Sequence, residues 1–77
     1  MKGYHYTILL HPEPEEGGFS VTVPALPGCL AQGETIEEAI TMAREAIAVH
    51  IAGLIEDGEP VPENEPGTQA ITISVAA

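Results

Sequence analysis

The feature that most restricts the fold of this chain is a segment with a helix-start signal at one end and a helix-stop signal at the other. Its first residues, Thr-Ile-Glu-Glu, form a capping box, in which the Thr35 hydroxyl accepts a hydrogen bond from the Glu38 amide and the Glu38 carboxylate reaches back toward the helix start. At the far end, Gly58 is the residue type that most often follows a helix. The sequence therefore predicts one helix from Ile36 to about Asp57, roughly 30 Å long.

This helix carries more apolar residues than one buried face requires. At about 100° per residue, one broad face should pack on a sheet. That face holds Ile36, Ala39, Ile40, Ala43, Ala46, Ile47, His50, Ile51 and Leu54. Further apolar residues lie on the rest of the helix, and Arg44 has no acidic residue three or four positions away. We therefore expect Met42, Arg44 and Val49 to lie at an interface between copies, in at least a dimer.

Three other segments, residues 4–10, 19–23 and 70–75, alternate apolar and polar residues as half-buried β-strands do. A fourth segment, residues 29–32, is short enough to be an edge strand. Residues 11–18 hold two prolines and two glycines, which interrupt strand pairing, so a hairpin loop is expected there. The apolar phase of the longer strands is formed by Tyr4, Tyr6, Ile8, Leu10, Phe19, Val21, Val23, Ile71, Ile73 and Val75.

These elements predict an α+β fold of order β-β-β-α-β in a single domain, residues 1–77. Three sequential strands with short connections favour an antiparallel meander. A helix that crosses back over one face would bring the last strand beside the first and parallel to it. We therefore expect a mixed four-stranded sheet of order 3-2-1-4 with the one long helix packed on one face. A chain of 77 residues buries only about 60–65% of its unfolded surface, which also favours self-association.

The charge of the chain restricts its partners. Twelve acidic residues face two basic ones, which gives a formal net charge of −10. Such a surface repels nucleic acids and anionic membranes and attracts basic proteins. The alternative is that the charge only keeps a small domain soluble. Cys29 is the single cysteine and the N-terminus lacks a signal-peptide pattern, so the sequence favours a reducing, cytoplasmic location.

The segment VPALPGCLAQGETIEEA, after a predicted β-hairpin, resembles the HicB-like antitoxins. The matching positions are Val23, Pro24, Leu26, Pro27, Gly28, Cys29, Gly33, Thr35, Glu38 and Ala39. The resemblance implies a partial ribonuclease-H-like sheet with one helix. It also implies an antitoxin that binds and occludes a small basic toxin, which cleaves RNA through a histidine. Many members carry a C-terminal DNA-binding module. This chain ends two residues after its last predicted strand, so we expect no such module and no direct binding to nucleic acid.

Neither catalysis nor metal binding is expected. Ribonuclease-H-type cleavage needs clustered carboxylates that hold two metals, and the first predicted strand contains no Asp or Glu. His5 and His11 follow the outward phase of that strand, whereas His50 faces the sheet, so the three cannot share one ion. Cys29 has no sequence-placed base to activate it and is better explained as a small buried hydrophobe. We expect no catalytic residue, no metal and no cofactor, and we interpret the prolines and glycines around Cys29 as a fold signature.

Two functions remain in contention. The first is an acidic protein-binding module that neutralises a small basic RNA-cleaving toxin of a type II toxin-antitoxin system. The carboxylates predicted to contact that toxin lie in the hairpin loop and past the helix: Glu13, Glu15, Glu16, Glu56, Asp57 and Glu59. The second is a stand-alone homo-oligomeric scaffold or regulatory protein without a toxin partner. A small-molecule enzyme ranks last, because only Cys29 and the histidines would support it.

Overall fold

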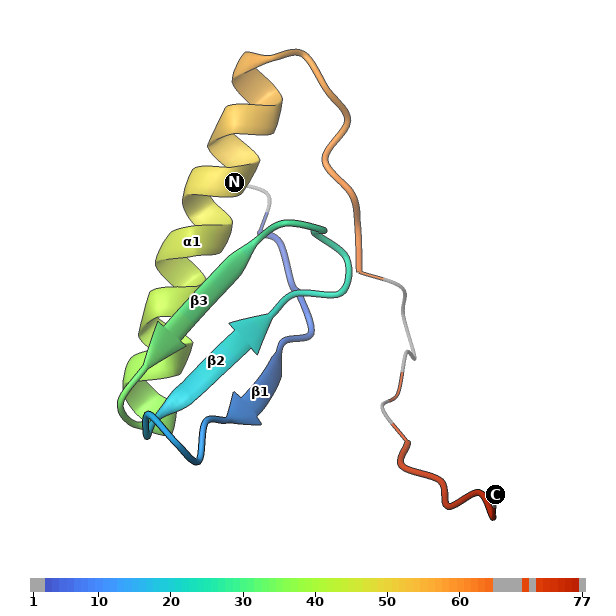
Figure 1. Cartoon of the computed structure of the whole chain (residues 1–77). Helices are drawn as coiled ribbons and strands as arrows, with labels where there is room; N and C mark the ends of the chain where they lie inside the picture. The colour runs from blue at the N-terminus through green and yellow to red at the C-terminus, as the bar shows by residue number, and fades with distance from the viewer. Residues whose placement is uncertain (1–2, 65–68, 70, 77) are drawn as a thin grey trace.

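The part of the chain that the structure describes folds into three short strands and one long helix. The computed structural model describes residues 3–64, 69 and 71–76. The elements follow one another as β1 (Leu9–Pro12), β2 (Phe19–Thr22), β3 (Leu30–Gly33) and α1 (Ile36–Glu56). The strands form an antiparallel sheet of order β1-β2-β3, and α1 crosses one face of it, packing mainly on β3 and less on β2 (Figure 1).

Both ends of α1 are fixed by local hydrogen bonds, which confirms the predicted bounds. Thr35 has an extended backbone, and its Oγ1 accepts from the Glu38 amide at 3.1 Å. The Glu38 carboxylate accepts from the Glu34 amide at 3.3 Å. At the other end the chain closes in a Schellman motif, in which the amides of Gly58 and Glu59 donate back to carbonyls of the last turn. Gly58 has a φ of 71°, which favours glycine.

The loop between β1 and β2 is shorter than expected, and the prediction is wrong at both bounds of β1, at both bounds of β3 and at the end of β2, which is Thr22 instead of Val23. β1 begins at Leu9 instead of residue 4, and it continues through Pro12, which pairs with Phe19. Proline is tolerated there because β1 is an edge strand and has no partner on its second side in the described sheet. The loop is closed by the Glu13 amide, which donates to the Gly18 carbonyl at 3.0 Å. β3 starts at Leu30, one residue late, because the Cys29 amide donates into a turn.

The core is small and aliphatic. It consists of Val21, Val23, Leu26, Cys29, Ala39, Ala43 and Ile51. Ile8, Leu10 and Phe19 pack against it, which confirms the predicted apolar phase of the first two strands. The predicted helix face is confirmed by its buried residues, except that Ile36 is 52% exposed. Leu26 fills the centre from the turn after β2, because its amide donates to the Val23 carbonyl and holds the turn closed.

The predicted fourth strand is absent from the described residues. The sheet has three antiparallel strands, so the 3-2-1 part of the predicted order is right and the mixed four-stranded sheet is wrong. Residues 71–76 form no strand and lie apart from the body of the molecule (Figure 1), while residue 70 lies outside the described residues.

A contact between distant parts of the chain accounts for the difference. The edge expected to receive the fourth strand, at Tyr6 and Thr7, is contacted by the segment that follows α1. Tyr6 donates from its hydroxyl to the Pro62 carbonyl at 2.6 Å, and the Thr7 amide donates to Asn64 Oδ1 at 2.9 Å. A side chain, instead of a strand, therefore satisfies the Thr7 amide.

Gly33→Ala should lower the free energy of unfolding by about 1–3 kcal/mol, because overpacking forces the backbone to move. A Cβ at this position would lie 2.5 Å from the Ala39 nitrogen and 2.8 Å from its Cα. The matched control is Gly53→Ala in α1, where a Cβ meets nothing within 4 Å. That change should raise stability by about 0.5–1 kcal/mol, because it removes a helical glycine. Urea unfolding followed by circular dichroism measures both, and equal stability of the two variants would contradict the close packing.

Candidate functional site

Carboxylates from two separate loops meet at one end of the sheet. The cross-strand register aligns Pro12, Phe19 and Gly33 across the three strands. The hairpin loop that follows Pro12 therefore lies beside the junction that leads from Gly33 into α1. Glu13 and Glu16 from the loop, and Glu34 and Glu38 from the junction, line one shallow hollow.

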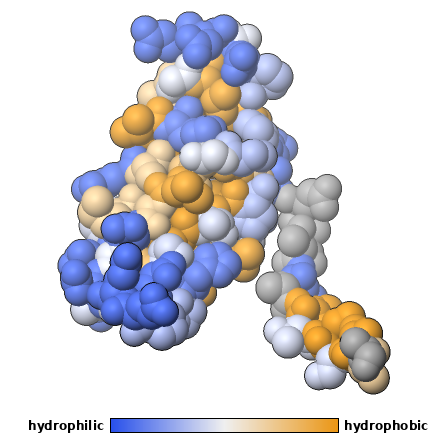
Figure 2. Space-filling view, in the orientation of Figure 1, coloured by the Kyte–Doolittle hydropathy of each residue, from blue (hydrophilic) through white to orange (hydrophobic). Residues whose placement is uncertain are grey.

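This surface is called the hairpin end. It comprises six exposed carboxylates: Glu13, Glu15, Glu16, Glu34, Glu37 and Glu38. The space-filling view shows a strongly hydrophilic surface there, at the lower left (Figure 2). At this end of the molecule the sequence predicts only the three carboxylates of the loop, Glu13, Glu15 and Glu16, as partner-binding residues. The antiparallel meander, which the sequence did predict, was the signal that could have added the other three.

The remaining predicted carboxylates lie at the opposite end of the molecule. Glu56, Asp57 and Glu59 are exposed at the C-terminal end of α1 and are called the helix end. A helix of 21 residues separates them from the hairpin end, which corresponds to about 30 Å. The six carboxylates predicted to bind one partner therefore form two surfaces, and a small partner would contact one of them at a time.

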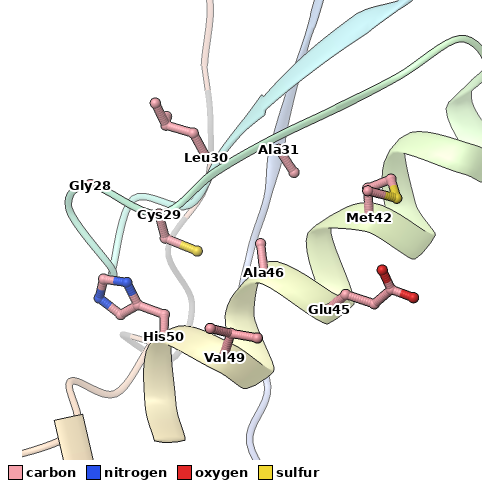
Figure 3. A pocket seen from close by; sticks show the side chains of 9 residues that line it. All are labelled: Gly28, Cys29, Leu30, Ala31, Met42, Glu45, Ala46, Val49 and His50. Atoms are coloured by element: carbon pink, nitrogen blue, oxygen red, sulfur yellow. The ribbon is translucent and has the colours of Figure 1, made fainter. Parts of the chain in front are cut away.

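The predicted interface residues on α1 are also divided between two places. Met42 and Val49, 42% and 74% exposed, line a hollow beside Cys29 and His50 (Figure 3). Arg44 lies on the other flank of α1, where it lines a separate groove. The structure thus brings Met42 and Val49 together and leaves Arg44 apart from them.

Cys29 belongs to the core. Its side chain is 4% exposed and points toward the helix turn that carries Ala46 and His50 (Figure 3). Burial raises the pKa of the Cys29 thiol, so the unreactive protonated form predominates at neutral pH. His50 is half-buried beside it, as its predicted position on the sheet-facing side of α1 requires.

The described residues offer neither a metal site nor a membrane-spanning helix. Within residues 3–64, 69 and 71–76, no three His, Cys, Asp or Glu side chains are placed to hold a metal ion. In the same part of the chain, no helix combines the length and apolar character that crossing a membrane requires.

Comparison with known protein families gives one match that covers most of the chain. Residues 6–73 match the family described as HicB-like antitoxin of bacterial toxin-antitoxin system. A 14.9 kDa protein of Haemophilus phage HP1 is 42% identical over 66 residues, which cover 82% of this chain and 50% of the phage protein. A UPF0150 protein from Synechocystis is 42% identical over 72 residues, covering 94% of this chain and 90% of the relative.

Proteins named as antitoxins are similar as well. Antitoxin HicB 1 of Photorhabdus laumondii is 38% identical over 80 residues, which cover 100% of this chain and 51% of the antitoxin. The crystal structure of the N-terminal domain of Burkholderia pseudomallei antitoxin HicB superposes with a TM-score of 0.62 at 40% identity. That match covers 88% of this chain and 69% of the solved one. The chain thus spans about half the length of the phage protein and of the Photorhabdus antitoxin.

Cys29 should react slowly with iodoacetamide at pH 8, because both burial and the raised pKa of its thiol reduce the exposed thiolate. We expect the folded protein to be labelled at least about tenfold more slowly than the chain in guanidinium. Leu30→Cys provides the matched control, because position 30 is the next residue and 67% exposed. Mass spectrometry follows both sites, and equal rates at positions 29 and 30 would contradict the core assignment.

Proposed function

Because the chain belongs to the HicB-like antitoxin family of bacterial toxin-antitoxin systems, we propose that it binds and neutralises a small basic toxin that cleaves RNA. The observation that carries the proposal is the family match, which extends over residues 6–73 and so over the whole sheet and helix. The proposed role is binding without catalysis, in the cytoplasm, where an RNA-cleaving toxin finds its substrate.

The charge of the chain supplies the physical basis for this binding. A net charge of −10 attracts a basic partner over several ångströms and speeds their encounter. The same charge opposes direct contact with nucleic acid phosphates. Exposed carboxylates accept paired hydrogen bonds from arginine side chains, which are also the groups that bind RNA phosphates. The acidic surface of this chain, when bound to the toxin, would therefore compete with RNA for the toxin's arginine side chains.

The hairpin end is the better candidate for the contact surface. It gathers six carboxylates on two adjacent loops, whereas the helix end has three. The positive end of the α1 dipole, roughly +0.5 of a charge, offsets only a small part of those six charges. The negative end adds about −0.5 to the other three and does not make up the difference.

The second candidate function is a homo-oligomeric scaffold without a toxin partner. Met42 and Val49, both exposed on α1, favour it, because a monomer gains nothing from apolar residues at these positions. The surfaces proposed for self-association and for toxin binding are different, so the presence of the first would not exclude the second. Inhibition of RNA cleavage separates the two functions.

The purified full chain should form a complex with the small basic protein encoded beside it and should stop that protein from cleaving RNA. Because opposite charges drive the association, its Kd should rise at least about tenfold between about 50 and 500 mM NaCl. Size-exclusion chromatography and an RNA cleavage assay measure the two effects. If the two proteins do not co-elute and the chain does not inhibit RNA cleavage, the antitoxin proposal is wrong.

Removing charge at the two ends should have unequal effects. The triple variant Glu13→Gln, Glu15→Gln and Glu16→Gln should weaken toxin binding by at least about tenfold, because each desolvated charge pair contributes strongly. The control is Glu56→Gln, Asp57→Asn and Glu59→Gln, which removes the same number of charges and should change Kd by less than about threefold.

Calorimetry measures both affinities, and circular dichroism checks that both variants fold. Equal losses would mean that only total charge matters, and a larger loss in the control would move the contact to the helix end. Either result rejects the hairpin end as the binding surface.

A further inference from the structure

A largely apolar groove, lined also by His5 and Arg44, runs along the flank of α1 that faces away from β3. It arises because α1 packs mainly on β3 and less on β2, so its flank toward residues 4–8 is covered less closely. One wall is formed by Tyr6 and Ile8 of the N-terminal segment, and the other by Ile40, Ile47 and Ile51 of α1. The groove encloses about 620 Å³ and is called the side groove. It lies on the helix-facing side of the segment that the order 3-2-1-4 would pair with the fourth strand.

A matching apolar segment lies elsewhere in the same chain. Residues 71–76, called the tail, alternate apolar and polar side chains with the period of a strand. Ile71, Ile73 and Val75 are 75–78% exposed. The tail projects from the body in Figure 1, and Figure 2 shows it as a hydrophobic patch detached from the rest of the surface. Three large apolar side chains on one face of an extended segment need a surface to cover them.

Hydrogen bonds attach the segment after the helix to the N-terminal segment of the same chain. The Asn64 side chain accepts from the Thr7 amide at 2.9 Å and donates to Thr7 Oγ1 at 3.3 Å. Tyr6 donates to the Pro62 carbonyl. These three bonds hold the chain against the N-terminal segment at residues 62–64. The tail of the same chain projects away from the body while these bonds are in place (Figure 1), which leaves the groove open to the tail of a second copy.

We propose that the tail of one copy docks in the side groove of a second copy, and that the exchange is reciprocal. Ile71, Ile73 and Val75 would then cover Ile40, Ile47 and Ile51 of the partner molecule. A twofold arrangement satisfies both grooves and both tails at once and closes the assembly as a dimer. The proposal does not depend on a toxin, because the side groove and the hairpin end share no residue.

Salt separates this association from toxin binding. Two copies each carry a charge of −10 and repel one another, so added salt strengthens apolar docking between them. Toxin binding joins opposite charges and weakens with salt. A failure of one proposal is therefore distinguishable from a failure of the other in the same titration.

The first test traps the exchange covalently in the full chain. A double variant with Ala48→Cys in the side groove and Ile73→Cys in the tail is oxidised under native conditions and run on a non-reducing gel. We expect mainly a disulfide-linked dimer of about 16 kDa, twice the 8.1 kDa of one chain. The control pairs Ile73→Cys with Ala52→Cys, one turn further along α1, exposed and outside the side groove. It should form at least about fivefold less linked dimer, because its sulfurs are too far apart.

The trap has two outcomes that overturn the proposal. A disulfide formed within a single chain would show that the tail docks in its own groove. Linked dimer at equal yield in the Ala52→Cys control would show only random collision. Cys29 stays in place in both variants, because it is buried and its thiol is protonated.

The second test needs no cross-link. Light scattering at about 100 μM should give the dimer mass for the unmodified protein and for the control variant Ala52→Glu. The variant Ala48→Glu should give the monomer mass, because it places a charge in the groove. A monomer mass for the unmodified protein overturns the proposal. Toxin binding then identifies the occupant. If the unmodified protein is a monomer, and Ala48→Glu abolishes toxin binding while Ala52→Glu does not, the toxin occupies the groove instead of a second copy.

Discussion

The rest of the structure depends on how closely α1 approaches β3. At Gly33 the chain leaves the sheet with no room for a Cβ against the backbone of Ala39, and Ala39 and Ala43 are fully buried against the strands. Glycine and alanine allow this short distance because they have little or no side chain to hold the two elements apart. The consequence is a helix that packs mainly on β3 and less on β2, while its other flank faces the N-terminal segment at Tyr6 and Ile8 instead of a strand of the described sheet.

The elements that the sequence predicted accurately are those fixed by neighbouring residues. Both ends of α1 are set by bonds within five residues, from the Thr35 cap to the Gly58 turn, so the local pattern contained all the necessary information. The bounds of β1 were wrong because alternation shows which side chains share a face and not which residues pair. Tyr6 and Ile8 have the predicted apolar phase, yet pairing with β2 begins only at Leu9.

The parts that could not be predicted depend on contacts between residues far apart in the chain. The bonds between Thr7 and Asn64 join positions 57 residues apart, and no local pattern reveals them. They decide what lies beside Tyr6 and Thr7, and so whether the last apolar segment pairs there. The candidate site shows the same limit. The six carboxylates named from the sequence have equivalent chemistry, and only the arrangement of β1, β2 and β3 places Glu13 beside Glu34 and Glu56 at the far end.

In the proposed dimer, the repulsion between two acidic chains opposes the burial of apolar tail residues. The two effects act at different places on the molecule, so both can be accommodated. Burying Ile71, Ile73 and Val75 in a second copy gains about 1.5–3 kcal/mol for each side chain. Repulsion between two chains of net charge −10 acts against that gain, but solvent screens it beyond about 8 Å at physiological salt. The side groove lies along the middle of α1, between the hairpin end and the helix end. Docking there would keep the densest charges away from the contact. Both hairpin ends of an exchanged pair would then stay accessible. Their combined field would attract a basic partner more strongly than the field of one copy.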